Sequence, residues 1–138
     1  MSQTDDVPED VRTFLSERIE SYEQLEILLL LRRENTGWTV QRLSSHLKIS
    51  PSLTEAAVAD LLSRGLVDSP LGPSQVRYTG GSRGPELEVT IARLADVYAA
   101  RPIEIIRLMT ANAIERVRTA ALRTFVDAFV LRRDKDNG

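Results

Sequence analysis

The stretch between Thr39 and Val67 constrains the fold most, because it places two helical patterns only a few residues apart. Thr39 is a suitable N-cap for the first helix. The tract LKISPS breaks that helix, and Ser50 followed by Pro51 is typical of the N-cap and first residue of the next one. Gly65 then marks its C-terminal end. The apolar inner positions of the first helix would be Val40, Leu43 and Leu47. The pattern predicts two helices joined by a short turn.

A hairpin is predicted directly after the second helix. Its two extended segments run from Leu66 to Asp68 and from Gln75 to Thr79, and the tract LGPSQ between them holds turn-forming residues. The next tract, GGSRGP, is interpreted as a linker, since it lacks the Lys-Ser/Thr ending of a phosphate-binding loop.

One alternative stays open for the start of the second helix: Ser52 and Glu55 could form a capping box that starts this helix slightly later.

Helices are predicted on both sides of this central part. Pro8, Glu9 and Asp10 favour a helix start, and a second start is marked by the capping-box pair Ser21 and Gln24. That second helix should end between Asn35 and Gly37, and the chain becomes helical again from Pro85. Buried positions in the first two helices would be Val11, Phe14, Leu15, Ile19, Leu25, Ile27, Leu28 and Leu29.

The chain has 138 residues, which suits one compact domain, and it contains no cysteine. This composition excludes disulfides, thiolate metal ligands and thiol nucleophiles. The acidic opening MSQTDDVPED resembles no targeting signal, and the longest aliphatic run, Ile27 to Leu31, is far shorter than the ~20 residues that cross a bilayer. We therefore expect a soluble, cytoplasmic protein.

Residues 22–80 resemble a winged helix-turn-helix domain. The string WTVQRLSSHLKISPSLTEAAVADLLSRGLV followed by QVRYT is similar to bacterial regulators of the MarR type, and the ending RTFVDAFVLRR resembles a group of small bacterial proteins with the same layout. The resemblance implies a mainly α fold with a small β-hairpin wing, flanked by N- and C-terminal helices. It divides the chain into an N-terminal tail and helix (1–20), a winged helix-turn-helix domain (21–84) and a C-terminal helical region for dimerisation (85–138).

The resemblance also implies that the helix from Ser50 to Arg64 is the DNA-recognition helix. The residues predicted to face outward are Ser52, Leu53, Glu55, Ala56, Ala59 and Asp60. None is Arg, Lys, Asn or Gln, the side chains that usually read guanine and adenine through paired hydrogen bonds. Glu55 could accept from a cytosine amino group and Ser52 could bind a phosphate or base, but Glu55 and Asp60 would repel a polyanion. Sequence-specific reading is therefore expected to be weak.

Phosphate contacts are the alternative source of DNA affinity. Residues 36–84 carry five Lys or Arg against three Asp or Glu, a difference of +2, so the central part is mildly basic. The DNA-binding residues predicted from the sequence are Arg42, Ser50, Ser52, Glu55, Arg64, Arg77 and Arg83. The prediction is a winged-helix transcriptional regulator with backbone-dominated contacts to duplex DNA. The competing hypothesis is a winged-helix module that binds another protein and not DNA.

Catalysis finds little support in the sequence. His46 is the only histidine, so no second imidazole or thiol can share a metal with it, and no acid is placed beside it to complete a triad with Ser44 or Ser45. We expect no enzymatic activity, no metal and no cofactor.

The C-terminal third predicts a short helix opened by Pro102 and then a longer helix capped by Asn112 and Glu115. The longer helix begins with an apolar stripe, formed by Ile114, Val117 and Ala121, opposite a polar face formed by Arg116, Thr119 and Arg123. From Phe125 to Leu131 it becomes apolar nearly all round, so it needs cover on more than one side. The cover could be the chain's own domain or a second copy. The resemblance to MarR-type regulators, which pair through terminal helices, favours the second option and implies a homodimer interface formed by Phe125, Val126, Phe129 and Val130.

Overall fold

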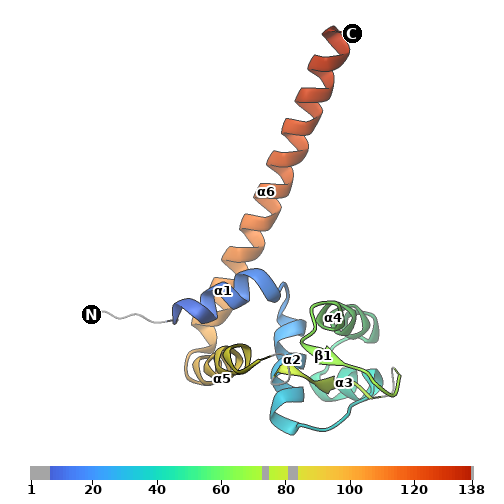
Figure 1. Ribbon diagram of the computed structural model, residues 1–138, viewed down its shortest axis with the longest axis vertical. Coiled ribbons are helices and arrows are strands. Elements are labelled where there is room, and N and C mark those ends of the chain that lie inside the picture. Colours follow the sequence, from blue (N-terminus) through green and yellow to red (C-terminus); the bar gives the residue numbers. More distant parts are fainter. Residues whose placement is uncertain (1–6, 73–74, 81–83, 138) are drawn as a thin grey trace, which may run out of the picture.

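The computed structural model describes residues 7–72, 75–80 and 84–137, and for residues 131–137 it describes the backbone only. Six helices and one small sheet make up this part of the chain (Figure 1). The elements are α1 (Glu9–Arg18), α2 (Tyr22–Glu34), α3 (Val40–Leu47), α4 (Pro51–Ser63), β1 (Val67–Asp68), β2 (Arg77–Tyr78), α5 (Pro85–Ala100) and α6 (Pro102–Asn137).

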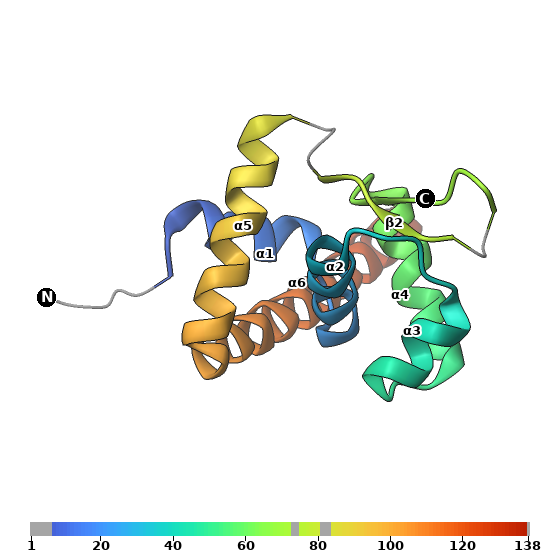
Figure 2. The same cartoon turned by 90° about the horizontal axis from the view of Figure 1, so that it is seen from below.

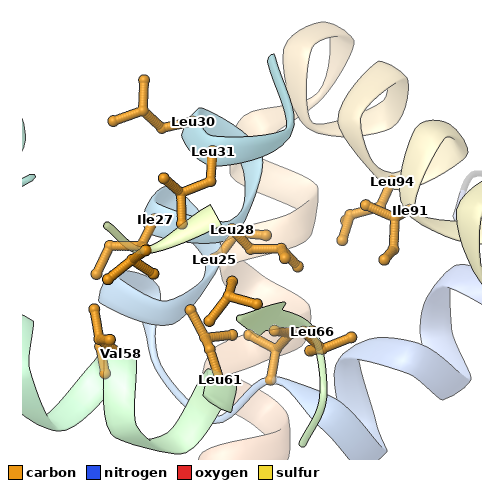
Figure 3. Close-up of a cluster of buried hydrophobic side chains, with 14 of the residues drawn as sticks. Leu25, Ile27, Leu28, Leu30, Leu31, Val58, Leu61, Leu66, Ile91 and Leu94 are labelled. Atoms are coloured by element: carbon orange, nitrogen blue, oxygen red, sulfur yellow. The ribbon is translucent and has the colours of Figure 1, made fainter. Parts of the chain in front are cut away.

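The helix α2 lies at the centre of the molecule, between α5 on one side and the α3–α4 pair on the other (Figure 2). Its apolar residues point both ways because they occupy more than one face of the helix (Figure 3). One cluster of buried side chains therefore joins all parts of the domain. The labelled members in Figure 3 are Leu25, Ile27, Leu28, Leu30, Leu31, Val58, Leu61, Leu66, Ile91 and Leu94.

The predicted pair of helices with a short turn is confirmed. Thr39 caps α3 by accepting from the Arg42 amide, and Ser50 caps α4 by accepting from the Leu53 amide, with Pro51 as the first helical residue. The alternative start at Ser52 is therefore wrong. Lys48 ends α3 in the left-handed conformation, with φ of 58°, which turns the chain sharply toward α4.

The predicted hairpin is also confirmed. Strands β1 and β2 pair antiparallel, with Val67 opposite Tyr78 and Asp68 opposite Arg77. A third partner was missed: Trp38 forms a bridge to Val76, with N–O distances of 3.0 and 2.8 Å in the two directions. The segment before α3 thus holds the wing against the helix-turn-helix. The fold is mainly α with a small β wing, a winged helix-turn-helix flanked by terminal helices.

The C-terminal region departs from the prediction. In place of a short helix followed by a second one, α6 is a single helix of 36 residues that extends away from the body of the molecule (Figure 1). The Asn112 and Glu115 pattern does not interrupt it, because no glycine or proline lies between Pro102 and Asn137. Among the described residues, no helix combines the length and apolar character needed to cross a membrane.

Candidate nucleic-acid interface

The second helix of the motif, α4, buries one face and exposes another, mostly as predicted. Thr54, Ala57, Val58 and Leu61 are buried against the core. The Thr54 hydroxyl donates to the Ser50 carbonyl at 2.9 Å, so this polar side chain is satisfied inside the helix start. Of the residues predicted to face outward, Ser52, Leu53, Glu55, Ala56 and Ala59 are exposed. This outer face is small, apolar and acidic, so it offers few donors to base edges.

Asp60 does not belong to the outer face, and its predicted outward orientation is wrong. It is partly buried, and its Oδ2 accepts a hydrogen bond of 2.9 Å from Nε2 of the buried Gln24 on α2. A carboxylate near the end of a helix is placed here to satisfy a buried amide of another helix. The structure therefore leaves Glu55 as the acid on the exposed surface of α4.

Arg64, which follows α4, uses its guanidinium within the protein. Nη1 donates to the Arg18 carbonyl at 2.8 Å and to Oε1 of Gln24 at 3.0 Å, while Nη2 lies 3.1 Å from a carboxylate oxygen of Glu20. These contacts join the end of α4 to the corner between α1 and α2. A guanidinium engaged in this way has little remaining capacity for an external phosphate.

Arg42, by contrast, presents its charge at the surface. It is exposed on α3, and its guanidinium carbon lies 3.9 Å from the centroid of the Trp38 ring, a cation–π geometry. The His46 ring meets the same indole edge-on, with centroids 5.2 Å apart. Since Trp38 is buried and bridged to the wing, this stacking holds the Arg42 guanidinium at the junction of α3 and the wing.

Arg77 is the exposed residue of β2, and Nη2 donates to Oε1 of Gln75 at 3.2 Å. A side chain at Gly37 would come within 3.3 Å of Arg77 Nε and within 3.1 Å of Gln75 Oε1, so the wing strand packs closely on the Gly37 backbone. Arg42 and Arg77 therefore both lie next to the Gly37–Trp38 segment. Arg83, also predicted from the sequence, lies outside the described residues.

The predicted site residues thus fall into two groups. Arg42, Ser50, Ser52, Glu55 and Arg77 are exposed on α3, α4 and the wing, while Arg64 turns toward the α1–α2 corner. The sequence analysis did not predict that Trp38 stacks with Arg42 and bridges to the wing. Its position directly before the Thr39 cap and four residues before Arg42 could have indicated this role. Within the described part of the chain, no three metal-ligating side chains come together.

The outer half of α6 forms a second exposed surface. Phe125 is 67% exposed and Phe129 is 59% exposed, and their rings stack with centroids 6.4 Å apart. Val126 and Val130 are exposed as well. Cover by the chain's own domain, the less favoured of the two predicted options, is therefore wrong for these residues.

The middle of α6, from Ile114 to Val117, is turned the opposite way from the prediction. Arg116, on the predicted polar face, turns inward and donates from Nη2 to the Ile19 carbonyl at 3.0 Å. Ile114 and Val117, on the predicted apolar stripe, are exposed. Ile114 and Val117 consequently face away from the domain, whereas Ile105, earlier in α6, is buried against it.

The sequence matches no protein-family model and no curated protein. It is similar to several solved structures. A MarR-family transcriptional regulator from Rhodococcus sp. RHA1 is 18% identical, with a TM-score of 0.44 over 74% of this chain and 78% of that one. The regulator Tm0710 from Thermotoga maritima is 17% identical, with a TM-score of 0.48 over 91% and 85%. A multiple antibiotic-resistance repressor from Listeria monocytogenes 4b F2365 is 21% identical, with a TM-score of 0.46 over 88% and 83%.

Proposed function

We propose that this protein is a dimeric, non-catalytic bacterial transcriptional regulator that holds duplex DNA mainly through the backbone phosphates. The observation that carries the proposal is a helix-turn-helix and wing in which Arg42 and Arg77 are exposed beside the Gly37–Trp38 segment. In winged and related helix-turn-helix proteins the second helix enters the major groove and neighbouring elements lie against the phosphates. Both arginines occupy those neighbouring elements.

The exposed arginines and the outer face of α4 would make different kinds of contact with DNA. Arginine donors bind phosphate oxygens through paired, charge-assisted hydrogen bonds that carry no sequence information directly. On α4 the candidates for base contact are Ser52 and Glu55, since the Ser50 hydroxyl already accepts from the Leu53 amide. A small set of phosphate contacts with little base reading gives modest affinity that depends on salt more than on sequence.

A salt titration with a pool of duplexes of different sequence tests this proposal. With about two to three phosphates neutralised per winged domain, log Kobs should fall with log salt at a slope of about −2 to −3 per domain. Arg77→Ala and Arg42→Ala should each weaken binding to all duplexes about equally and make the slope shallower by about one.

Arg12→Ala is the matched control, because it removes the same charge from an exposed position on α1, outside the helix-turn-helix and the wing. Equal losses of affinity in Arg12→Ala and Arg77→Ala would show that the effect comes from net charge alone. Tight binding to one sequence at physiological salt, lost on changing Ser52 or Glu55 but retained in Arg77→Ala, would contradict backbone-dominated binding.

The homodimer proposal rests on the exposed apolar stripe of α6. Isolated apolar side chains at a surface are ordinary, but one helix here exposes several large ones, most of them in its outer half, among them Ile114, Val117, Leu122, Phe125, Val126, Phe129 and Val130. A second copy is the occupant that presents the same stripe, and a two-fold pair would place one against the other. Phe125, Val126, Phe129 and Val130 are the proposed interface residues.

A protein-binding module remains the second candidate, and one observation favours it. Leu53 is 52% exposed and Leu62 is 38% exposed on α4, with the small residues Ala56 and Ala59 between them. An apolar strip of this kind suits a partner protein better than a polyanion. Leu53→Asp separates the two functions: it should abolish a protein complex, whereas the loss of DNA affinity should be no larger than one added negative charge produces.

A further inference from the structure

Tyr78 ties the wing to the body of the protein. It follows the exposed Arg77 on β2, and because neighbouring side chains of a strand point to opposite faces, its phenol turns inward. The Tyr78 hydroxyl donates to Oε1 of Glu88, in the first turn of α5, at 2.6 Å. The second carboxylate oxygen of Glu88 accepts from Arg32 on α2, at 3.1 Å from Nε and 2.8 Å from Nη2.

This cluster connects three elements that are distant in sequence: the wing, α5 and the central helix α2. The hydrogen bonds to Glu88 are charge-assisted, and those from the Tyr78 hydroxyl and Arg32 Nη2 are short. The Arg32 pair uses two guanidinium nitrogens on one oxygen, which restricts its geometry. Burial alone would raise the pKa of Glu88, but the hydrogen bonds from Tyr78 and Arg32 outweigh it and lower the pKa below the usual value. Glu88 is therefore a carboxylate at neutral pH and accepts from both partners.

Gly80 is adapted to the same arrangement. A side-chain carbon at this position would collide with the ring and hydroxyl of Tyr78, so the absence of a side chain leaves room for the phenol beside the backbone. The anchor therefore depends on one tyrosine, the carboxylate that it binds and one glycine next to it.

We propose that Tyr78, Glu88 and Arg32 are positioning residues that fix the wing so that Arg77 is presented to DNA phosphates. The inference rests on the proposed function, since Arg77 is a proposed phosphate contact. A two-residue strand pair has little stability by itself, so a wing of this size needs a side-chain anchor to hold a fixed direction. Tyr78, on the opposite face of the strand from Arg77, supplies that anchor.

A double-mutant cycle in DNA binding tests the inference. Tyr78→Phe removes only the hydroxyl, and Arg77→Ala removes the proposed contact. If Tyr78 acts through Arg77, the two changes together should weaken binding less than the product of the single effects, by at least about twofold, the lower end of the coupling that neighbouring residues show. Gly80→Ala should behave as Tyr78→Phe does.

Tyr98→Phe is the matched control, because its hydroxyl donates to Glu26 at the same distance of 2.6 Å but joins α5 to α2 without touching the wing. Tyr98→Phe and Arg77→Ala should combine multiplicatively. Multiplicative behaviour of Tyr78→Phe with Arg77→Ala, or equal coupling in the control pair, would overturn the proposed role.

Amide hydrogen exchange tests the anchor without DNA. The amides of Trp38 and Val76 close the bridge between the wing and the segment before α3, so their exchange reports wing opening. Tyr78→Phe should speed both by about fivefold, which corresponds to about 1 kcal/mol for one lost hydrogen bond, and Tyr98→Phe should leave them near the wild-type rate. Unchanged exchange in Tyr78→Phe would refute the anchor. Absence of wild-type DNA binding with faster exchange in Tyr78→Phe would instead refute the proposed function alone.

Discussion

At the scale of single residues, two acids on α4 have opposite surroundings. Glu55 is exposed on the outer face, whereas Asp60, five residues later, turns to the buried amide of Gln24. Gln24 in turn accepts from Arg64 and from the Glu20 amide, so Asp60 belongs to a polar network that holds the α1–α2 corner against α4. Only the first of these two acids can act on a ligand at the outer face.

Removing the charge of Glu55 should therefore strengthen DNA binding without disturbing the fold. We expect Glu55→Gln to lower Kd for duplex DNA about two- to fivefold at low salt. A negative charge near phosphates costs up to about 1 kcal/mol when both groups are exposed to water. Asp60→Ala should instead lower the free energy of unfolding by about 1 kcal/mol, since it leaves the buried Gln24 amide without its acceptor. Thermal melts and binding isotherms of both variants give the comparison, and weaker DNA binding by Glu55→Gln would mean that this carboxylate reads bases.

The pH dependence of stability should reveal Glu88. Its pKa is lowered below the ordinary 4.5 in the folded protein, so it stabilises the fold above that value, and the contribution is lost as pH falls through the lowered pKa. Glu88→Gln should be less stable than the wild type at neutral pH and should lose less stability on acidification below about pH 4.5. Urea unfolding as a function of pH measures both curves, and parallel curves would exclude a depressed pKa at Glu88.

At the scale of elements, α6 is the unusual one. Its inner part buries Ile105 and turns Arg116 to the Ile19 carbonyl, while Ile103, Ile106 and Ile114 remain exposed. Beyond this part it projects from the body (Figure 1), and helices in proteins owe most of their stability to tertiary packing and not to helix propensity. We therefore expect the second copy of the proposed dimer to stabilise the outer half of α6.

Phe125→Asp should separate the proposed dimer and leave the winged domain folded. A charge placed within the apolar contact should weaken the dimer more than about thirtyfold, an effect of about 2 kcal/mol. The winged core should survive because Phe125 is 67% exposed in the single chain, but circular dichroism should show helix loss as the outer half of α6 frays. Sedimentation measures the assembly. Ala120→Asp adds the same charge at an exposed position on the face of α6 opposite Phe125 and should stay dimeric, and a wild-type monomer at tens of micromolar would contradict the proposal.

At the scale of the whole molecule, the proposed DNA-binding and dimer surfaces are separate. The first lies on α3, α4 and the wing, and the second on the outer part of α6, which projects away from them (Figure 1). The connection between them runs through α5, which receives the wing anchor at Glu88 near its start and leads into α6 at its end. Two copies joined through α6 would offer two winged domains to one duplex.

Dimer formation should therefore raise DNA affinity without any new contact at the winged domain. In Phe125→Asp, binding to a duplex long enough for both domains should weaken at least about tenfold, and the salt slope should fall to about half, because one domain neutralises half as many phosphates. On a duplex that fits one domain only, the variant and the wild type should bind alike. Equal slopes on the long duplex would show that a single domain makes all the contacts.

The sequence alone determined the local structure. The N-cap residues Thr39 and Ser50, the terminal Gly65 and the apolar spacing of α1 and α2 fixed the order of elements correctly, since capping and periodicity act between residues that are close in the chain. The Asn112 and Glu115 pattern predicted a helix boundary that does not exist. Residues of this kind do not interrupt a helix when helix-forming residues continue on both sides.

The partners of the polar side chains depend on the tertiary fold and could not be predicted from the sequence. Asp60, Arg64 and Arg116 each look like surface residues in the sequence, yet each bonds to a group that the fold brings near from a distant segment. The Tyr78–Glu88–Arg32 cluster also joins segments that are distant in the sequence. The sequence likewise did not show which side of α6 is exposed. Which face of a helix meets solvent depends on what packs against it, and that packing is set by long-range contacts that periodicity does not encode.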